Sequence, residues 1–108
     1  MDIDLRVRVL LSVQRALVGE ITPEMRAVSV EWSPKEVLLR VFVDGLVADQ
    51  IRDDFDASVV TQIMADFIHS ERCEPPIEFE FIRVDDPVPI PNVGTFVFGR
   101  AGTSFQVK

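Results

Sequence analysis

The chain has 108 residues, of which 47% are hydrophobic and 27% charged, and its formal net charge is −7. This length and composition predict one soluble globular domain and argue against intrinsic disorder. No apolar run approaches the 18 residues of a membrane span, and the acidic N-terminus lacks the form of a secretory signal. The single cysteine, Cys73, excludes a disulfide framework, so we expect a cytosolic protein.

The acidic residues are concentrated in the middle of the chain. Residues 44–86 contain twelve of the eighteen acidic residues and only three basic ones. This excess of negative charge argues against a nucleic-acid ligand, because a polyanion requires cationic partners. Two interpretations stay open: the acids keep a small protein in solution, or they form a surface that meets a basic protein.

The first segment has two periodicities. Apolar and polar residues alternate over residues 3–9, as they do in a strand. Over the longer window 3–18, one helical face carries Leu5, Val9, Val13, Ala16 and Leu17. Gly19 then supplies a residue that commonly ends a helix. We predict a helix over residues 3–18; a strand there would add an edge to the sheet and remove a helix.

The next two elements read as strands joined by a short turn. Val28, Val30 and Trp32 alternate with polar residues, and residues 37–43 form the most apolar stretch of the chain. Between them, residues 33–36 include a proline that favours a turn. The pattern predicts an antiparallel hairpin, with Trp32 in the core.

The second helix is expected from about Asp54 to residue 68, after a segment at 46–52 that is either a connector or one loose helical turn. A strand follows at 77–81, where Ile77, Phe79 and Phe81 alternate with glutamates. Apolar residues then change parity, so we expect a bulge or a change of face near Phe81 or Ile82.

The last part of the chain contains a proline-rich segment, a strand and a tail. Three prolines occupy alternate positions within residues 85–91, which predicts stiff, extended backbone. A strand is expected at 95–100, and residues 101–108 as a flexible tail. The fold class is therefore α+β: one domain over residues 1–100, a two-layer sandwich in the order α-β-β-α-β-β. Its mainly antiparallel four-stranded sheet would carry both helices on one face.

The sequence offers little material for catalysis. His69 and Cys73 are the only histidine and the only cysteine, and nothing supplies the third group that a nucleophilic site needs. Two such residues are also too few for a structural zinc site. We therefore expect no enzymatic activity, no metal and no cofactor.

Several short motifs resemble a known family over about residues 10–100. They are Ala16–Pro23, Arg26–Val30, Phe42–Gly45, Ala65-Asp66-Phe67, Arg83–Pro89 and Gly94–Arg100. Together they resemble the bacterial immunity proteins of contact-dependent growth inhibition systems and their uncharacterised relatives. Phe96 and Phe98 stand where those relatives often have tyrosine, and the last eight residues look like an extension.

The resemblance implies a cytosolic antidote that binds a cognate toxin domain, often a nuclease. An acidic inhibitor suits a basic toxin, because complementary fields accelerate encounter. The alternative is a small acidic, non-catalytic subunit or adaptor of another assembly. Neither needs a nucleic acid, a membrane or a small-molecule substrate. The candidate partner-binding residues are the acids Asp49, Asp53, Asp54, Asp56, Glu78, Glu80, Asp85 and Asp86.

Overall fold

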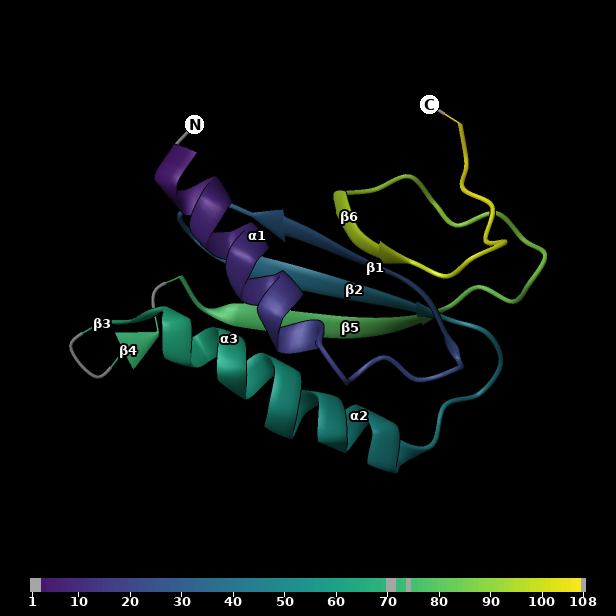
Figure 1. The fold of residues 1–108 in the computed structure, drawn as a ribbon, viewed down its shortest axis with the longest axis horizontal. Coiled ribbons are helices and arrows are strands. Elements are labelled where there is room, and N and C mark those ends of the chain that lie inside the picture. Colours follow the sequence, from purple (N-terminus) through teal and green to yellow (C-terminus); the bar gives the residue numbers. More distant parts are fainter. Residues whose placement is uncertain (1–2, 70–71, 74, 108) are drawn as a thin grey trace.

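The computed structural model describes residues 3–69, 72–73 and 75–107, and it shows a helical layer on one face of a sheet (Figure 1). The elements are α1 (Ile3–Leu17), β1 (Met25–Trp32), β2 (Val37–Val43), α2 (Asp49–Phe55), η1 (Asp56–Val60), α3 (Thr61–Asp66), β3 (Ile68–His69), β4 (Arg72–Cys73), β5 (Ile77–Arg83) and β6 (Thr95–Gly99). The main sheet has the strand order β5-β2-β1-β6. The predicted α+β class and the order α-β-β-α-β-β are confirmed.

The first segment is a helix, as the longer periodicity predicted. Val9, Val13, Ala16 and Leu17 are buried against the sheet. Gly19 follows the helix with a φ of 79°, a left-handed conformation that glycine adopts at little steric cost. The chain then turns back toward β1.

The second helix begins earlier than predicted. α2 starts at Asp49 and continues through the π-helical turn η1 into α3, so the segment 46–52 contains the helical turn that was the alternative to a connector. The pattern left this turn open because only Ile51 packs inward from it, while its acids are exposed. The wider π turn also lets the neighbouring Val59 and Val60 both reach the core.

The sheet combines an antiparallel hairpin with one parallel pair. β1 and β2 are antiparallel neighbours, as predicted, and β6 lies antiparallel on the other side of β1. β5 pairs in parallel with β2, because the chain crosses the helical layer between the two strands. A second antiparallel pair, β3 with β4, follows α3.

The sequence left two alternatives near Phe81 or Ile82, a bulge or a change of face. The bulge is absent from the pairing of β5 with β2, which keeps one register from Ile77 to Arg83. The parity changes for another reason: both faces of the sheet are covered at this end. Ile82 and Val84 pack on the second face against a small cluster of Ala27, Phe42 and Ile90. The register shifts of this sheet lie in the pairings of β1 instead, between Met25 and Ala27 and between Val28 and Ser29.

The main core lies between the helical layer and the sheet. Phe55 of α2 is 2% exposed and contacts Phe79 and Phe81 of β5, with ring centroids 5.6 and 5.4 Å apart. The cluster includes Leu39 and Val41 of β2. The second helix therefore packs on β2 and β5. Trp32, expected in the core, is only partly buried at its margin.

The segment after β6 runs back along the proline-rich segment. Ile90 forms a β-bridge with Phe105, and the Phe105 ring stacks edge-on against Phe96 at 4.8 Å. The amide of Gln106 donates a hydrogen bond to the carbonyl of Ile90. These contacts place the segment expected to be a tail, while its flexibility stays a prediction.

Phe55→Ala should lower the free energy of unfolding by about 3–5 kcal/mol, because a fully buried ring is removed. Phe79→Ala should cost less, since Phe79 is only partly buried on the edge strand. Urea unfolding of both variants and the parent measures the difference. A larger loss for Phe79→Ala than for Phe55→Ala would contradict this assignment of the core.

Candidate functional site

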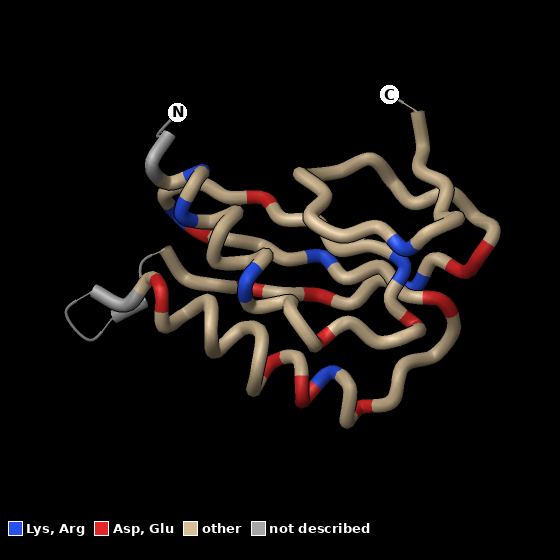
Figure 2. Tube along the Cα trace, viewed as in Figure 1, with Lys and Arg blue, Asp and Glu red and all other residues tan. Residues whose placement is uncertain are grey.

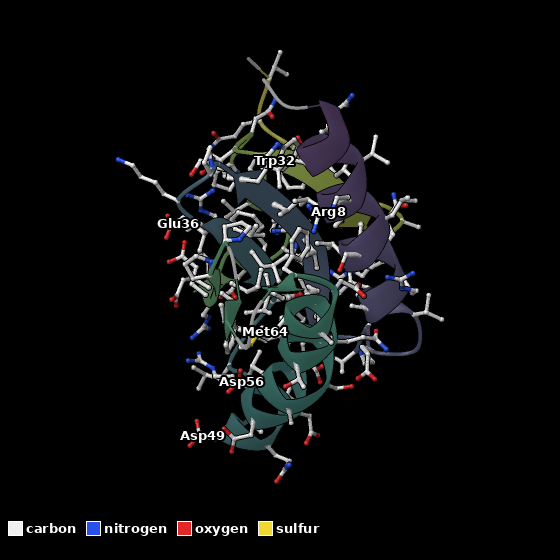
Figure 3. The ribbon with its side chains drawn as sticks, turned by 90° about the vertical axis from the view of Figure 1, so that its left-hand side faces the viewer. Arg8, Trp32, Glu36, Asp49, Asp56 and Met64 are labelled. Carbon is white, nitrogen blue, oxygen red and sulfur yellow. The ribbon has the colours of Figure 1, made fainter. Side chains whose placement is uncertain are left out.

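Four of the candidate acids form an exposed stripe on the second helix. Asp49, Asp53 and Asp56 follow one another at helical spacing, with Asp54 beside them, and all four side chains are exposed. Figure 2 marks acidic positions in red along α2 and η1, and Figure 3 shows Asp49 and Asp56 pointing into solvent. We refer to these four residues as the acidic stripe.

The acidic stripe is poorly neutralised. Asp54 accepts a hydrogen bond of 2.7 Å from the amide of Gln50, and within the described part of the chain no Lys or Arg forms an ion pair with the four acids. The nearby Arg52 places its guanidinium over the ring of Phe81, 5.5 Å from the centroid. The stripe therefore projects a negative field into solvent.

Glu78 and Glu80 lie on β5, on the sheet face opposite the helices. Arg40 of β2 contacts Glu80 at 3.1 Å and Glu31 of β1 at 3.0 Å, so three strands contribute to one charge cluster. Glu78 is exposed and forms no ion pair with any described residue. Of these two glutamates, Glu78 keeps the more accessible charge.

Asp85 and Asp86 hold the fold together at the end of the sheet where β2 and β5 finish. Asp85 accepts a hydrogen bond of 2.6 Å from the amide of Gly45 and contacts Arg83 at 2.9 Å. The hydrogen bond from Arg83, followed by that from Gly45, lowers the pKa of Asp85 below its usual value. The amide of Asp86 donates to the carboxylate of Asp44 at 3.3 Å. These two acids have arginine partners, which the acidic stripe lacks among the described residues.

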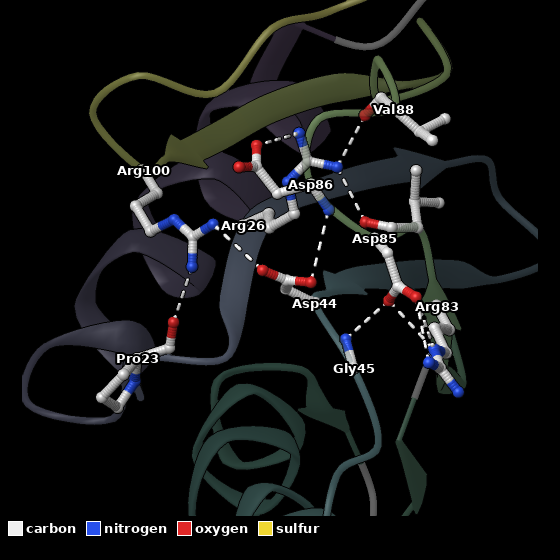
Figure 4. Close-up of polar contacts among 10 residues, drawn as sticks. Pro23, Arg26, Asp44, Gly45, Arg83, Asp85, Asp86, Val88 and Arg100 are labelled. Carbon is white, nitrogen blue, oxygen red and sulfur yellow. Dashed lines mark hydrogen bonds and ion pairs between the residues drawn. The ribbon is translucent and has the colours of Figure 1, made fainter.

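A completely buried arginine lies at the centre of this region (Figure 4). Nη1 of Arg26 donates to the carbonyl oxygens of Val84 and Val88, each at 2.7 Å. Its Nη2 lies 3.5 Å from a carboxylate oxygen of Asp86. A planar guanidinium can satisfy several acceptors at once, so Arg26 fixes the chain on both sides of residues 85–87.

Five of the motifs that carry the family resemblance are linked by the contacts around Arg26. The strand β1 contributes Arg26 itself, the end of β2 contributes Asp44 and Gly45, and the proline-rich segment contributes Asp85 and Asp86. Arg100, after β6, donates to the carbonyl of Pro23 at 2.8 Å and approaches Asp44 at 3.8 Å. These motifs therefore build the fold.

The Ala65-Asp66-Phe67 motif joins the two helices. Ser12 of α1 donates a hydrogen bond of 2.6 Å to Asp66, and Arg15 contacts the same carboxylate oxygen at 2.6 Å. The hydrogen bond from Ser12, supported by Arg15, lowers the pKa of Asp66. Arg8 lies over the buried ring of Phe67, 4.9 Å from its centroid. This motif also has a structural role.

The catalytic candidates that the sequence offers are His69 and Cys73. Their side chains are not among those that the structure describes. The backbone places His69 on β3 and Cys73 on β4, in a hairpin and not on one helix. Among the described residues, no group of three or more His, Cys, Asp or Glu could hold a metal ion. Within the same ranges, no helix is long and apolar enough to span a membrane.

Sequence reasoning missed the role of Arg26. It noted the residue only within a motif, because nothing in the local pattern separates a buried arginine from one at a strand end. The signal lies far away, in carbonyl groups 58 and 62 residues along the chain.

Arg26→Met should lower the free energy of unfolding by about 2–4 kcal/mol, because the carbonyl groups of Val84 and Val88 lose a charged donor that is itself fully buried. Arg6→Met is the matched control: Arg6 is exposed, and we expect a change within about 0.5 kcal/mol. Urea unfolding compares the two variants. An equal, small effect of both would show that Arg26 does not anchor the proline-rich segment.

The contribution of Asp66 to stability should depend on pH. Its folded pKa is lowered, so the stabilisation is present above about pH 4 and is lost as the pH falls through the folded value. Asp66→Asn should therefore be less stable than the parent at pH 7, with the difference shrinking below pH 4. Urea unfolding from pH 2.5 to 7 measures this, with the exposed Asp53→Asn as control. A difference that is constant with pH would contradict the assignment.

A comparison with protein-family models shows the family to which the chain belongs. The model described as MafI2 immunity protein matches residues 6–102, which spans α1 to β6 and all the motifs discussed above. No curated protein matches the chain.

An immunity protein neutralises a toxin, so the family implies a cognate toxin as partner. Immunity proteins are typically non-catalytic, which agrees with the prediction that the chain is not an enzyme. The resemblance noted in the sequence is confirmed at the level of an immunity protein. The match covers most of the chain, and the protein belongs to the MafI2 immunity protein family.

Proposed function

We propose that this protein is a cytosolic bacterial antidote that binds and neutralises a basic toxin domain, as part of a contact-dependent growth inhibition system. Family membership supports the neutralising role. The charge distribution supports a basic partner, because four exposed acids lie together on α2 and η1 and, among the described residues, no Lys or Arg forms an ion pair with them. A nuclease domain fits this description, since enzymes that bind nucleic acid present basic surfaces.

The acidic stripe on α2 and η1 is the proposed contact. Its four carboxylates are exposed, and they stand on a helix whose inner face is fixed in the core by Phe55, Val59 and Val60. The charges are therefore held at defined positions without ion pairs to described residues that a toxin would have to break. Such an arrangement favours fast encounter with a cationic surface.

The other candidate acids are less suited to the contact. Asp85, Asp86 and Glu80 already interact with arginines of the same chain. If these acids turned to bind a toxin, they would leave their arginine partners unpaired. Glu78 is the remaining accessible acid, and it lies on the opposite face of the sheet. It is the next residue to test if the acidic stripe is not involved.

The function itself is tested by co-expression. A basic toxin-like reading frame next to the gene should arrest growth when it is expressed alone, and co-expression of this chain should restore growth. The two products should also purify together. Unrelieved growth arrest with a correctly folded chain would exclude that toxin as the cognate partner.

Reversing Asp53, Asp54 and Asp56 to Lys should slow association with the immobilised toxin domain by about tenfold or more at low salt. The gap should narrow as ionic strength rises, because salt screens exposed charges, while dissociation changes less. The measurement is the association rate against salt concentration for parent and variant.

A matched control is available in the turn between β1 and β2. Glu36→Lys makes the same charge change as Asp53→Lys at another exposed position. We expect Asp53→Lys to slow association more than Glu36→Lys does. Equal rates for the triple variant and the parent at low salt would remove the acidic stripe from the mechanism.

A further inference from the structure

β5 is one of the two edge strands of the main sheet, and it is the less protected one. It has seven residues without a proline, and its pairing with β2 keeps a single register. Among the described residues, no strand pairs with its other side. β6, at the opposite edge, has five residues, and the ring of Phe105 from the C-terminal segment lies 4.8 Å from that of its Phe96. Proteins commonly shorten, distort or cover an edge strand, because its unpaired backbone can pair with another chain. β5 is neither short nor distorted, and no described strand covers it.

The free backbone groups of β5 follow from its pairing with β2. The amide of Val37 donates to the carbonyl of Pro76 at 2.8 Å. At the other end of the pair, the amide of Val84 donates to the carbonyl of Val43 at 2.9 Å. The even-numbered residues of β5 therefore direct their N–H and C=O groups toward β2, since successive residues of a strand alternate in this direction. The odd-numbered residues direct theirs toward the open edge: Ile77, Phe79, Phe81 and Arg83.

The open edge of β5 lies beside the acidic stripe. Arg52 of α2 holds its guanidinium 5.5 Å from the centroid of the Phe81 ring. Asp49 and Asp56 stand three residues before and four residues after Arg52, so they share its face of the helix. Figure 3 places both acids on the side of the second helix turned away from α1, and Figure 1 shows this helix running along β5. A strand added to β5 would therefore lie next to these carboxylates.

We propose that the cognate toxin adds an extended, basic strand to the open edge of β5, along Phe79–Arg83. This inference rests on the proposed function of toxin binding and specifies its contact. The backbone of the added strand exchanges hydrogen bonds with Phe79, Phe81 and Arg83, which supply affinity. Its basic side chains meet the acidic stripe, which supplies selectivity and speeds encounter.

The acids around this edge favour a basic strand over a second copy of the chain. Glu80 is exposed on the face of β5 opposite the helices. Two copies of β5 paired antiparallel over Ile77–Arg83 would bring Glu80 directly opposite Glu80, and like charges in this position are destabilising. Arg40 contacts Glu80 at 3.1 Å but is shared with Glu31, so one arginine serves two glutamates in each copy. A strand with Lys or Arg at the facing position replaces this repulsion with attraction.

The test is residue-resolved hydrogen exchange of the chain, free and bound to the toxin domain that it neutralises in the co-expression assay. In the free chain, the outward amides of Phe79 and Phe81 should exchange at least about tenfold faster than their inward neighbours. Those neighbours, Glu80 and Ile82, pair with β2 and are the internal control. In the complex, exchange at Phe79 and Phe81 should slow by about tenfold or more, with little change at the inward amides.

A matched pair of variants tests the same edge by affinity. Arg83→Pro removes the outward N–H at the end of β5, whereas Arg83→Ala keeps it, and both lose the same side-chain contact with Asp85. Proline is tolerated on an edge strand where its missing N–H would face solvent. We expect Arg83→Pro to bind the immobilised toxin domain about tenfold or more weakly than Arg83→Ala. Thermal unfolding confirms that both variants are folded.

The outcomes separate this inference from the proposed function. Unchanged exchange at Phe79 and Phe81 in a complex that still forms, or equal affinities of the two Arg83 variants, would overturn the edge pairing and leave the neutralising function intact. Slow exchange of both amides in the free chain would also overturn it, because the edge would then be paired already. A chain that fails to bind the toxin domain at all would contradict the proposed function, and the edge pairing would fall with it.

Discussion

The buried guanidinium of Arg26 is the interaction on which this fold depends. It lies between strand β1 and the proline-rich segment, and it donates hydrogen bonds to the carbonyls of Val84 and Val88. Prolines lack amide donors, so a segment rich in them cannot secure itself by pairing as a strand does. A side-chain donor performs that task here. The segment in turn covers the second face of the sheet, where Phe42 and Ile90 are buried.

The acids of this protein divide into two groups with different roles. Asp44, Asp66, Asp85 and Asp86 interact with arginines or backbone amides of the same chain, and the pKa values of Asp66 and Asp85 are lowered by those contacts. The acids of the acidic stripe have no such arginine partners among the described residues. The net charge of the chain does not distinguish these two groups. It explains why the family motifs, which contain members of the first group, indicate the fold more directly than the contact with a toxin.

Local patterns predicted the fold class well, because each main element has a clear period and a clear end. Residues 3–18 carry one buried helical face, and Ile77, Phe79 and Phe81 carry one buried strand face. The patterns left alternatives open where distant groups decide. The helical turn at the start of α2 depends on Ile51 packing on a sheet that the local sequence does not show, and the change of parity at Ile82 reflects cover by residues near Ile90. The candidate site was limited in the same way. The sequence identified the acids, but only the contacts distinguish an acid with an arginine partner, such as Asp85, from an exposed one, such as Asp53.

The parallel pairing of β5 with β2 bears on the order in which the chain can assemble during synthesis. β1, β2 and α1 form from the first 43 residues, but β2 then has an unpaired edge until residues 77–83 leave the ribosome. An apolar strand with an open edge can pair with another nascent chain. The acids of α2 and η1 emerge during this interval, and their mutual repulsion between neighbouring chains opposes such pairing. The same charges that we assign to partner binding would thus protect the chain while it is being made.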